Sequence, residues 1–234
     1  MMKIAGIQKC SMVDYPGKIC AVLFTSGCNM DCYYCHNRWL MNSETVNSHI
    51  NESDILSFLR KRIKFLDGVV ISGGEPTLQN DLISFISKIK SIGYDVKLDT
   101  NGTNYEVMKN LINSNLVDYV AMDLKAPYEK YNSYCGNKYN KDNIKKSINL
   151  LLEGKVEYEF RTTVLPQFDE PDIIEMAKQI QGARFYALQQ YRPPESLTLF
   201  DDPRIKDTPH SAEWIKEMAE SVKSYVCSCD TRGC

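Results

Sequence analysis

Short apolar runs alternate with longer segments of mixed polarity along most of the chain. In the mixed segments apolar residues recur at helical spacing, as Leu82, Phe85, Ile86 and Ile89 do. The apolar runs have the length of strands and end in polar or glycine-containing stretches. We expect six strands, at residues 19–25, 69–72, 95–99, 117–123, 157–165 and 184–189. Strands that alternate with helices predict an α/β protein in which helices cover a parallel sheet.

Six strand–helix units predict a partial barrel. A closed eight-fold barrel typically takes about 250 residues, and this chain has 234. We therefore predict a partial (β/α)6 barrel with a parallel sheet, similar to an incomplete TIM barrel. An open doubly wound sheet is the alternative. No linker, repeat or low-complexity segment interrupts residues 1–226, which we interpret as a single domain.

The last eight residues, 227–234, contain three cysteines and are predicted to form a separate tail. Three interpretations of Cys227, Cys229 and Cys234 stay open. They are redox-active thiols, ligands of a second metal site, or free thiols of a mobile tail. The further ligands of such a metal site would come from Cys10, Cys20 or Cys135.

The strongest candidate for chemistry is the loop after the first predicted strand, which carries Cys28, Cys32 and Cys35. Three thiolates can ligate three irons of a [4Fe–4S] cubane and leave the fourth iron without a protein ligand. Such an open position can bind a substrate or cofactor. Structural zinc is disfavoured because His36 directly follows Cys35, and adjacent residues rarely reach two corners of one tetrahedron. Unmetallated thiols are the remaining alternative.

The other predicted strands also end in chemically capable residues. These are Gly73, Gly74 and Glu75, then Asp99, Thr100 and Asn101, then Asp123 and Lys125, then Arg161, and finally Gln189. Because the carboxyl ends of parallel strands meet at one edge of a sheet, we expect these residues and the cysteine loop to form one pocket.

Two of these loops have both a functional and a structural interpretation. Gly73 and Gly74 would let a ligand approach bare backbone, whereas an ordinary tight turn is the alternative. Asp99 and Thr100 suit ribose hydroxyls or a hard cation. For Asn101 an Asx-type turn is an equally good explanation.

Charged residues mark the later strands. Asp123 and Lys125 would point to the same face of a strand and could hold a zwitterion or a cation. An exposed ion pair is the alternative. Arg161 lies within an apolar strand, so we expect it to be paired or to bind an anionic group.

Composition excludes some classes of function. The 28 basic and 30 acidic side chains nearly balance, which disfavours a nucleic-acid-binding protein. No apolar run approaches the roughly 18 residues that span a membrane, and the first residues are too quickly polar for a signal peptide. Nine cysteines without a predicted export signal indicate a reducing cytoplasm, and an oxygen-sensitive cluster would fit an anaerobic host.

Taken together, the chain resembles the radical S-adenosylmethionine enzymes. The resemblance is carried by Cys28-x3-Cys32-x2-Cys35 with Tyr34 before the last cysteine, and by Gly73, Gly74 and Glu75. Within that superfamily it is similar to the activases of glycyl radical enzymes, above all the activating protein of anaerobic ribonucleoside-triphosphate reductase. The segments that match are residues 13–18, 35–37, 99–102 and 123–125.

The resemblance implies a reaction. The open iron of a [4Fe–4S] cluster would bind S-adenosylmethionine, and an electron from a flavodoxin or ferredoxin-type protein would lead to cleavage of its carbon–sulfur bond. The resulting 5′-deoxyadenosyl radical would take a hydrogen atom from a glycine of the partner enzyme.

The resemblance also implies roles for individual residues. Gly73, Gly74 and Glu75 would face the methionine amino group, and the backbone of Tyr34 would meet the adenine. Asp99, Thr100 and Asp123 match positions that hold a monovalent cation. Asn101, Lys125 and Gln189 would contact the cofactor, and Arg161 would lie near the substrate glycine.

Other functions stay open. The partner could be pyruvate formate-lyase or another glycyl radical enzyme, and a peptide-modifying or small-molecule radical enzyme would keep the same cofactor. A non-catalytic electron carrier or zinc-stabilised interaction protein would leave the loops at residues 73–75 and 99–102 unexplained.

Overall fold

The computed structural model describes residues 2–41, 48–193 and 202–234. Its strands belong to one open, mostly parallel sheet in which they follow one another in chain order from β1 to β8. The strands are β1 Ile4–Ser11, β2 Cys20–Thr25, β3 Gly68–Gly73, β4 Asp95–Thr100, β5 Tyr119–Asp123, β6 Glu157–Val164, β7 Tyr186–Gln190 and β8 Cys229–Arg232. The predicted α/β class and parallel sheet are confirmed, and the sheet is not closed into a barrel.

Helices connect most of the parallel strands. They are α1 Glu52–Arg62, α2 Leu82–Ile92, α3 Tyr105–Asn113, α4 Tyr131–Cys135, α5 Lys141–Leu152, α6 Glu170–Gln179 and α7 Ala212–Ser221. Short 3-10 turns lie at Arg38–Leu40, Pro76–Leu78, Tyr128–Lys130, Pro203–Lys206 and Val222–Ser224. No helix of the described residues is both long and apolar enough to cross a membrane.

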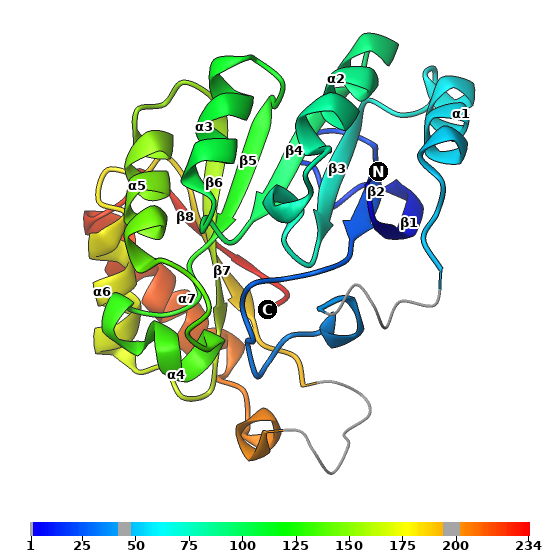
Figure 1. The fold of residues 1–234 in the computed structure, drawn as a ribbon. Coiled ribbons are helices and arrows are strands. Elements are labelled where there is room, and N and C mark those ends of the chain that lie inside the picture. Colours follow the sequence, from blue (N-terminus) through cyan, green and yellow to red (C-terminus); the bar gives the residue numbers. More distant parts are fainter. Residues whose placement is uncertain (1, 42–47, 194–201) are drawn as a thin grey trace. The chain divides into compact units, whose positions relative to one another are not determined.

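The chain divides into two compact units. The first comprises residues 1–29, 37–121 and 142–157. In it β1 pairs antiparallel with β2, while β2, β3 and β4 pair in parallel. Helix α2 packs against β4, and α1 packs against α2 (Figure 1). The core is formed by apolar side chains of the strands and by the inward faces of the helices, as Val70 and Phe85 illustrate.

The second unit comprises residues 30–36, 122–141 and 158–234. Here β6, β7 and β8 pair in parallel, and α7 packs against β7 and β8 (Figure 1). Helix α6 begins at a capping box, in which the Asp169 side chain accepts from the Asp172 amide and the Asp172 side chain accepts from the Asp169 amide. Because β6, β7 and β8 run in parallel, their carboxyl ends lie on one edge of this unit.

Two strands were not predicted from the sequence. Strand β1 is half exposed and is held by its antiparallel pairing with β2. Strand β8 has four residues and a polar sequence, and it is held by pairing with β7. Both lie at edges of the sheet, where an apolar run is not required. Residues 229–232 of the predicted cysteine-rich tail thus belong to the sheet.

Candidate functional site

In the first unit, the chain at the end of β3 packs closely against the backbone that leads into the cysteine loop, and two glycines allow this approach. The Gly74 amide donates to Thr25 O at 2.8 Å, and the Glu75 amide donates to Gly27 O at 2.8 Å. A Cβ atom on Gly74 would lie 2.2 Å from Gly27 O, and one on Gly73 would lie 2.4 Å from the Thr25 backbone. Close backbone packing therefore requires these glycines even without a ligand. Their contact with a cofactor stays a prediction.

Glu75 is a buried brace between two loops. Its Oε1 accepts from the Thr77 amide at 3.1 Å, from the Thr77 hydroxyl at 2.5 Å and from the Thr100 hydroxyl at 2.8 Å. Its Oε2 accepts from the Asn101 amide at 2.7 Å. Burial raises the pKa of the Glu75 carboxyl, although these hydrogen bonds oppose the shift. The brace joins the loop after β3 to the loop after β4.

Asp99, one residue before the end of β4, is in an ion pair that the sequence analysis missed. Lys97 is buried and places its Nζ 2.5 Å from Asp99 Oδ1, while the Ser72 hydroxyl donates to Asp99 Oδ2 at 3.1 Å. A lysine two residues before an aspartate in a strand shares its face, and this was the available signal. The predicted cation would therefore share the Asp99 carboxylate with an ammonium group.

Asn101 lies beside the first cysteine. Its Nδ2 donates to Asn29 Oδ1 at 3.0 Å and lies 4.0 Å from Cys28 Sγ. Its Oδ1 accepts from the Thr103 amide at 3.0 Å and from the Thr103 hydroxyl at 2.6 Å. The Asx-type turn, one of the two explanations considered for Asn101, is present, and the same side chain also contacts the cysteine loop. Asn29 and Thr103 are members of this site that the sequence did not reveal.

The second unit holds the rest of the cysteine loop against the end of α4. The Asp31 amide donates to Cys135 O at 2.9 Å, and the Tyr33 amide donates to Tyr134 O at 3.3 Å. The Cys32 and Cys135 side chains share a hydrogen bond, which together with burial raises the pKa of Cys32 well above its usual value. Cys135 therefore lies beside a predicted cluster ligand.

Tyr34 and Cys35 complete the loop. The Tyr34 ring is buried, and its hydroxyl lies 3.4 Å from Lys125 O. The Cys35 amide donates to Cys32 O at 3.1 Å, so a tight turn separates the two cysteines. Cys35 is partly exposed.

Asp123 at the end of β5, Lys125 two residues after it and Arg161 within β6 form one charged cluster. Asp123 Oδ1 accepts from Arg161 Nε at 2.8 Å, and Asp123 Oδ2 accepts from Lys125 Nζ at 2.9 Å. Burial would raise the pKa of Asp123, but the Arg161 and Lys125 charges outweigh it and hold this pKa below its usual range. Burial likewise opposes protonation of Lys125, yet Asp123 raises the Lys125 pKa. Arg161 is thus paired, one of the two states expected for it, and Asp123 joins it to Lys125 in one cluster that the sequence analysis did not predict.

The remaining predicted residues of the second unit lie on β7, on β8 or beside β8. Gln189 of β7 is in register with Thr163 of β6 and Arg232 of β8. Cys229 is buried in β8, where burial and then Asp230 raise its pKa to about 12, while Cys227 and Cys234 are exposed. Among the described residues of this unit, no three Cys, His, Asp or Glu side chains are grouped to hold a metal ion. The role of Cys227, Cys229 and Cys234 therefore stays open.

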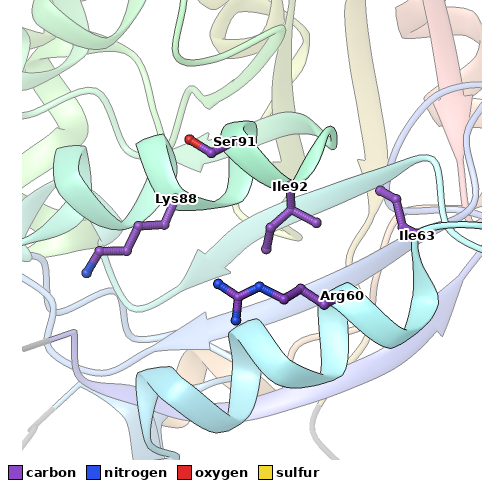
Figure 2. A pocket seen from close by; sticks show the side chains of 5 residues that line it. All are labelled: Arg60, Ile63, Lys88, Ser91 and Ile92. Atoms are coloured by element: carbon purple, nitrogen blue, oxygen red, sulfur yellow. The ribbon is translucent and has the colours of Figure 1, made fainter.

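A groove of about 420 Å³ lies between α1 and α2, away from these loops. It is lined by Arg60, Ile63, Lys88, Ser91 and Ile92 (Figure 2). These residues lie near the ends of helices that lead into β3 and β4, and so at the amino ends of those strands. The candidate site of this unit lies at the opposite, carboxyl ends, so the groove is not part of it.

A family comparison fits the cysteine loop. Residues 22–180 match the model of the radical SAM superfamily. The chain belongs to this superfamily and is therefore a radical S-adenosylmethionine enzyme, which uses a [4Fe–4S] cluster and S-adenosylmethionine. Within the part of the chain that the structure describes, Cys28, Cys32 and Cys35 are in no disulfide bond, and cysteine thiolates are the ligands that hold such clusters. The donor chemistry of the loop therefore fits the cofactor of the family.

Two relatives from Methanocaldococcus jannaschii have related sequences. The protein named "Putative glycyl-radical enzyme activating enzyme MJ1227" is 38% identical over 95% of this chain and 92% of its own length. The protein named "Putative glycyl-radical enzyme activating enzyme MJ1632" is 34% identical over 65% of this chain and 59% of its own length.

A solved structure shares the fold. Streptococcus suis SuiB bound to S-adenosylmethionine matches 89% of this chain with a TM-score of 0.67 and 17% identity. The match covers 48% of SuiB, so this chain spans about half the length of that protein. At this identity the likeness supports the fold alone.

Proposed function

We propose that this enzyme activates a glycyl radical enzyme by removing a hydrogen atom from a glycine of its partner. The observation that carries the proposal is a relative named "Putative glycyl-radical enzyme activating enzyme MJ1227", which is 38% identical over nearly the full length of both chains. The absence of further cysteines between Cys35 and Gly73 also favours a small activase without accessory clusters. The preferred partner is the anaerobic ribonucleoside-triphosphate reductase.

Residues of both units have proposed roles. Cys28, Cys32 and Cys35 would hold the cluster, which together with S-adenosylmethionine supplies reductive carbon–sulfur cleavage and a 5′-deoxyadenosyl radical when bound. Asn101, next to Cys28, would orient the first ligand. The protein would further exclude water from the site and position the partner's glycine.

The charged cluster of the second unit would supply fixed cations. Asp123 raises the Lys125 pKa and holds Lys125 and Arg161 each by a hydrogen bond of 2.8–2.9 Å. Lys125 would contact the cofactor and Arg161 would lie near the substrate glycine. Gly73, Gly74, Thr100, Gln189 and Tyr34 are proposed cofactor contacts, and Asp99, Thr100 and Asp123 are proposed contacts of a monovalent cation.

The test is a coupled anaerobic assay. Reconstituted enzyme, dithionite and S-adenosylmethionine should release 5′-deoxyadenosine, and an added reductase should acquire a glycyl radical signal in electron paramagnetic resonance. A variant with all three loop cysteines changed to alanine is the control and should give neither product nor signal. Cleavage without a glycyl signal on the reductase or on pyruvate formate-lyase would refute activation and favour a peptide-modifying or small-molecule enzyme. A flavodoxin or ferredoxin-type donor, in a cytoplasmic setting, should replace dithionite.

A further inference from the structure

Tyr33, the residue between Cys32 and Tyr34, is held by a segment far along the chain. The Arg204 guanidinium lies over its ring, 3.9 Å from the centroid. The Tyr33 hydroxyl donates to Gln167 Oε1 at 2.5 Å, and the ring is buried. All of these residues belong to the second unit.

Arg204 is itself fixed on three sides. Its Nε and one terminal nitrogen donate to the two oxygens of Asp202 at 2.9 and 2.7 Å. The other terminal nitrogen donates to Ser133 O at 3.1 Å. A guanidinium bound in this bidentate way keeps its plane, so it presents a fixed face to the tyrosine ring.

The same segment also holds the hydroxyl end of Tyr33. Gln167 Nε2 donates to Asp207 Oδ2 at 2.7 Å and to Arg204 O at 3.1 Å. The segment 202–207 therefore fixes both the face of the ring and the partner of its hydroxyl. We call this segment the strap.

The end of α4 supports the loop through its backbone. Tyr134 O and Cys135 O accept from the Tyr33 and Asp31 amides, and the Tyr134 ring lies 5.8 Å from the Tyr33 ring. The Arg204 guanidinium lies 5.8 Å from the Tyr134 ring as well. Arg204 thus lies against two aromatic rings, that of Tyr33 in the cysteine loop and that of Tyr134 in α4.

We infer that Arg204 is a positioning residue that orders the Cys32–Cys35 part of the loop before any cluster is bound. It acts through Tyr33, whose neighbour Cys32 is a proposed ligand. An ordered loop loses less conformational entropy when its thiolates are drawn into one site. The inference rests on membership of the superfamily and does not require a glycyl radical partner.

Hydrogen exchange in the cluster-free chain tests the inference directly. In Arg204→Ala, the Asp31 and Tyr33 amides should exchange about tenfold faster, the ratio expected for loss of a partly desolvated cation–π contact. Lys206→Ala is the matched control, because Lys206 lies in the same strap and is exposed. It should leave both amides unchanged. Equal rates in wild type and Arg204→Ala would overturn the inference, as would an equal effect of Lys206→Ala.

A second set of variants separates positioning from general destabilisation. Tyr33→Phe keeps the ring, so Arg204→Ala should still accelerate exchange in that background. Tyr33→Leu removes the ring, and there Arg204→Ala should add little. Equal effects in the two backgrounds would overturn the inference. If Arg204→Ala does not fold, Arg204→Lys replaces it, because lysine keeps the charge but not the planar face. The Asp31 and Tyr33 amides should then exchange faster than in wild type, though less than tenfold. Wild-type exchange rates in Arg204→Lys would count against the inference.

Cluster retention gives a readout on the loaded protein other than activity. After reconstitution, Arg204→Ala should lose iron to a chelator several-fold faster than wild type and Lys206→Ala. Unchanged loss of iron would contradict the inference even if S-adenosylmethionine cleavage were altered.

Discussion

At the scale of single residues, the site is built from polar groups that hold one another. Glu75 collects four hydrogen bonds, and Asp123 binds two cations. Buried or partly buried carboxylates are costly unless they are paired, so each is tied to the loops that it joins. Removing either carboxylate should therefore lower the stability of the fold even before a cofactor binds.

The Asp123 cluster makes a prediction about pH. The Asp123 pKa is lowered in the folded chain, so its contribution to stability is fully present above about pH 4, the ordinary range of aspartate, and is lost progressively as the pH falls from there towards the lowered folded pKa. Asp123→Asn in the cluster-free chain should lower the free energy of unfolding by about 2 kcal/mol at pH 7, and by clearly less near about pH 2, where the folded carboxyl begins to be protonated. Urea unfolding measures both values.

Glu153→Gln provides the control for this experiment, because the Glu153–Lys155 pair is largely exposed. It should change stability by less than about 0.5 kcal/mol. A difference between Asp123→Asn and wild type that does not vary with pH would contradict the argument.

Glu75 gives a second prediction at this scale. In Glu75→Gln an amide nitrogen would replace one acceptor among four donors, so one donor would lose its partner in a buried place. We expect a loss of about 2 kcal/mol in urea unfolding. The control is Glu106→Gln at an exposed position, which should cost about 0.5 kcal/mol or less. A Glu75→Gln variant as stable as that control would show that the hydrogen bonds of Glu75 do not stabilise the fold.

At the scale of elements, the glycines after β3 set how closely two loops approach. In Gly74→Ala the new Cβ would overlap Gly27 O at 2.2 Å, so the loop that leads to Cys28 must move. We expect a loss of about 1–3 kcal/mol or more, measured by thermal unfolding. In Gly6→Ala of β1 the new atom would meet Phe24 at an ordinary 3.7 Å, and stability should stay within about 1 kcal/mol of wild type.

At the scale of the whole chain, β8 joins the C-terminal residues to the sheet. Arg232 of β8 donates to both oxygens of Glu159 at 3.1 and 2.5 Å, and Glu159 is buried. Arg232→Ala would leave a buried carboxylate without this partner, so we expect a loss of about 2–4 kcal/mol in urea unfolding. Asp230→Ala, which is exposed on the same strand, is the control and should be near neutral. A neutral Arg232→Ala would show that β8 contributes little.

Much of the fold was predictable because parallel strands buried on both faces are apolar throughout. The six predicted strands correspond to β2–β7, with ends shifted by one or two residues. The edge strands β1 and β8 escaped prediction, since their residues are half exposed and their pairing is decided by distant neighbours. A local pattern carries no signal for such strands.

The sequence by itself determined the chemistry of this protein. The cysteine spacing, the glycine pair and the charges at strand ends are local features, and thiolate donors are recognisable without coordinates. Only the tertiary structure decided which groups hold these residues. Contacts such as Arg204 over Tyr33, Cys135 beside Cys32 and Arg232 on Glu159 join segments far apart in the chain. Their energies depend on distance in space, which no periodicity along the sequence records.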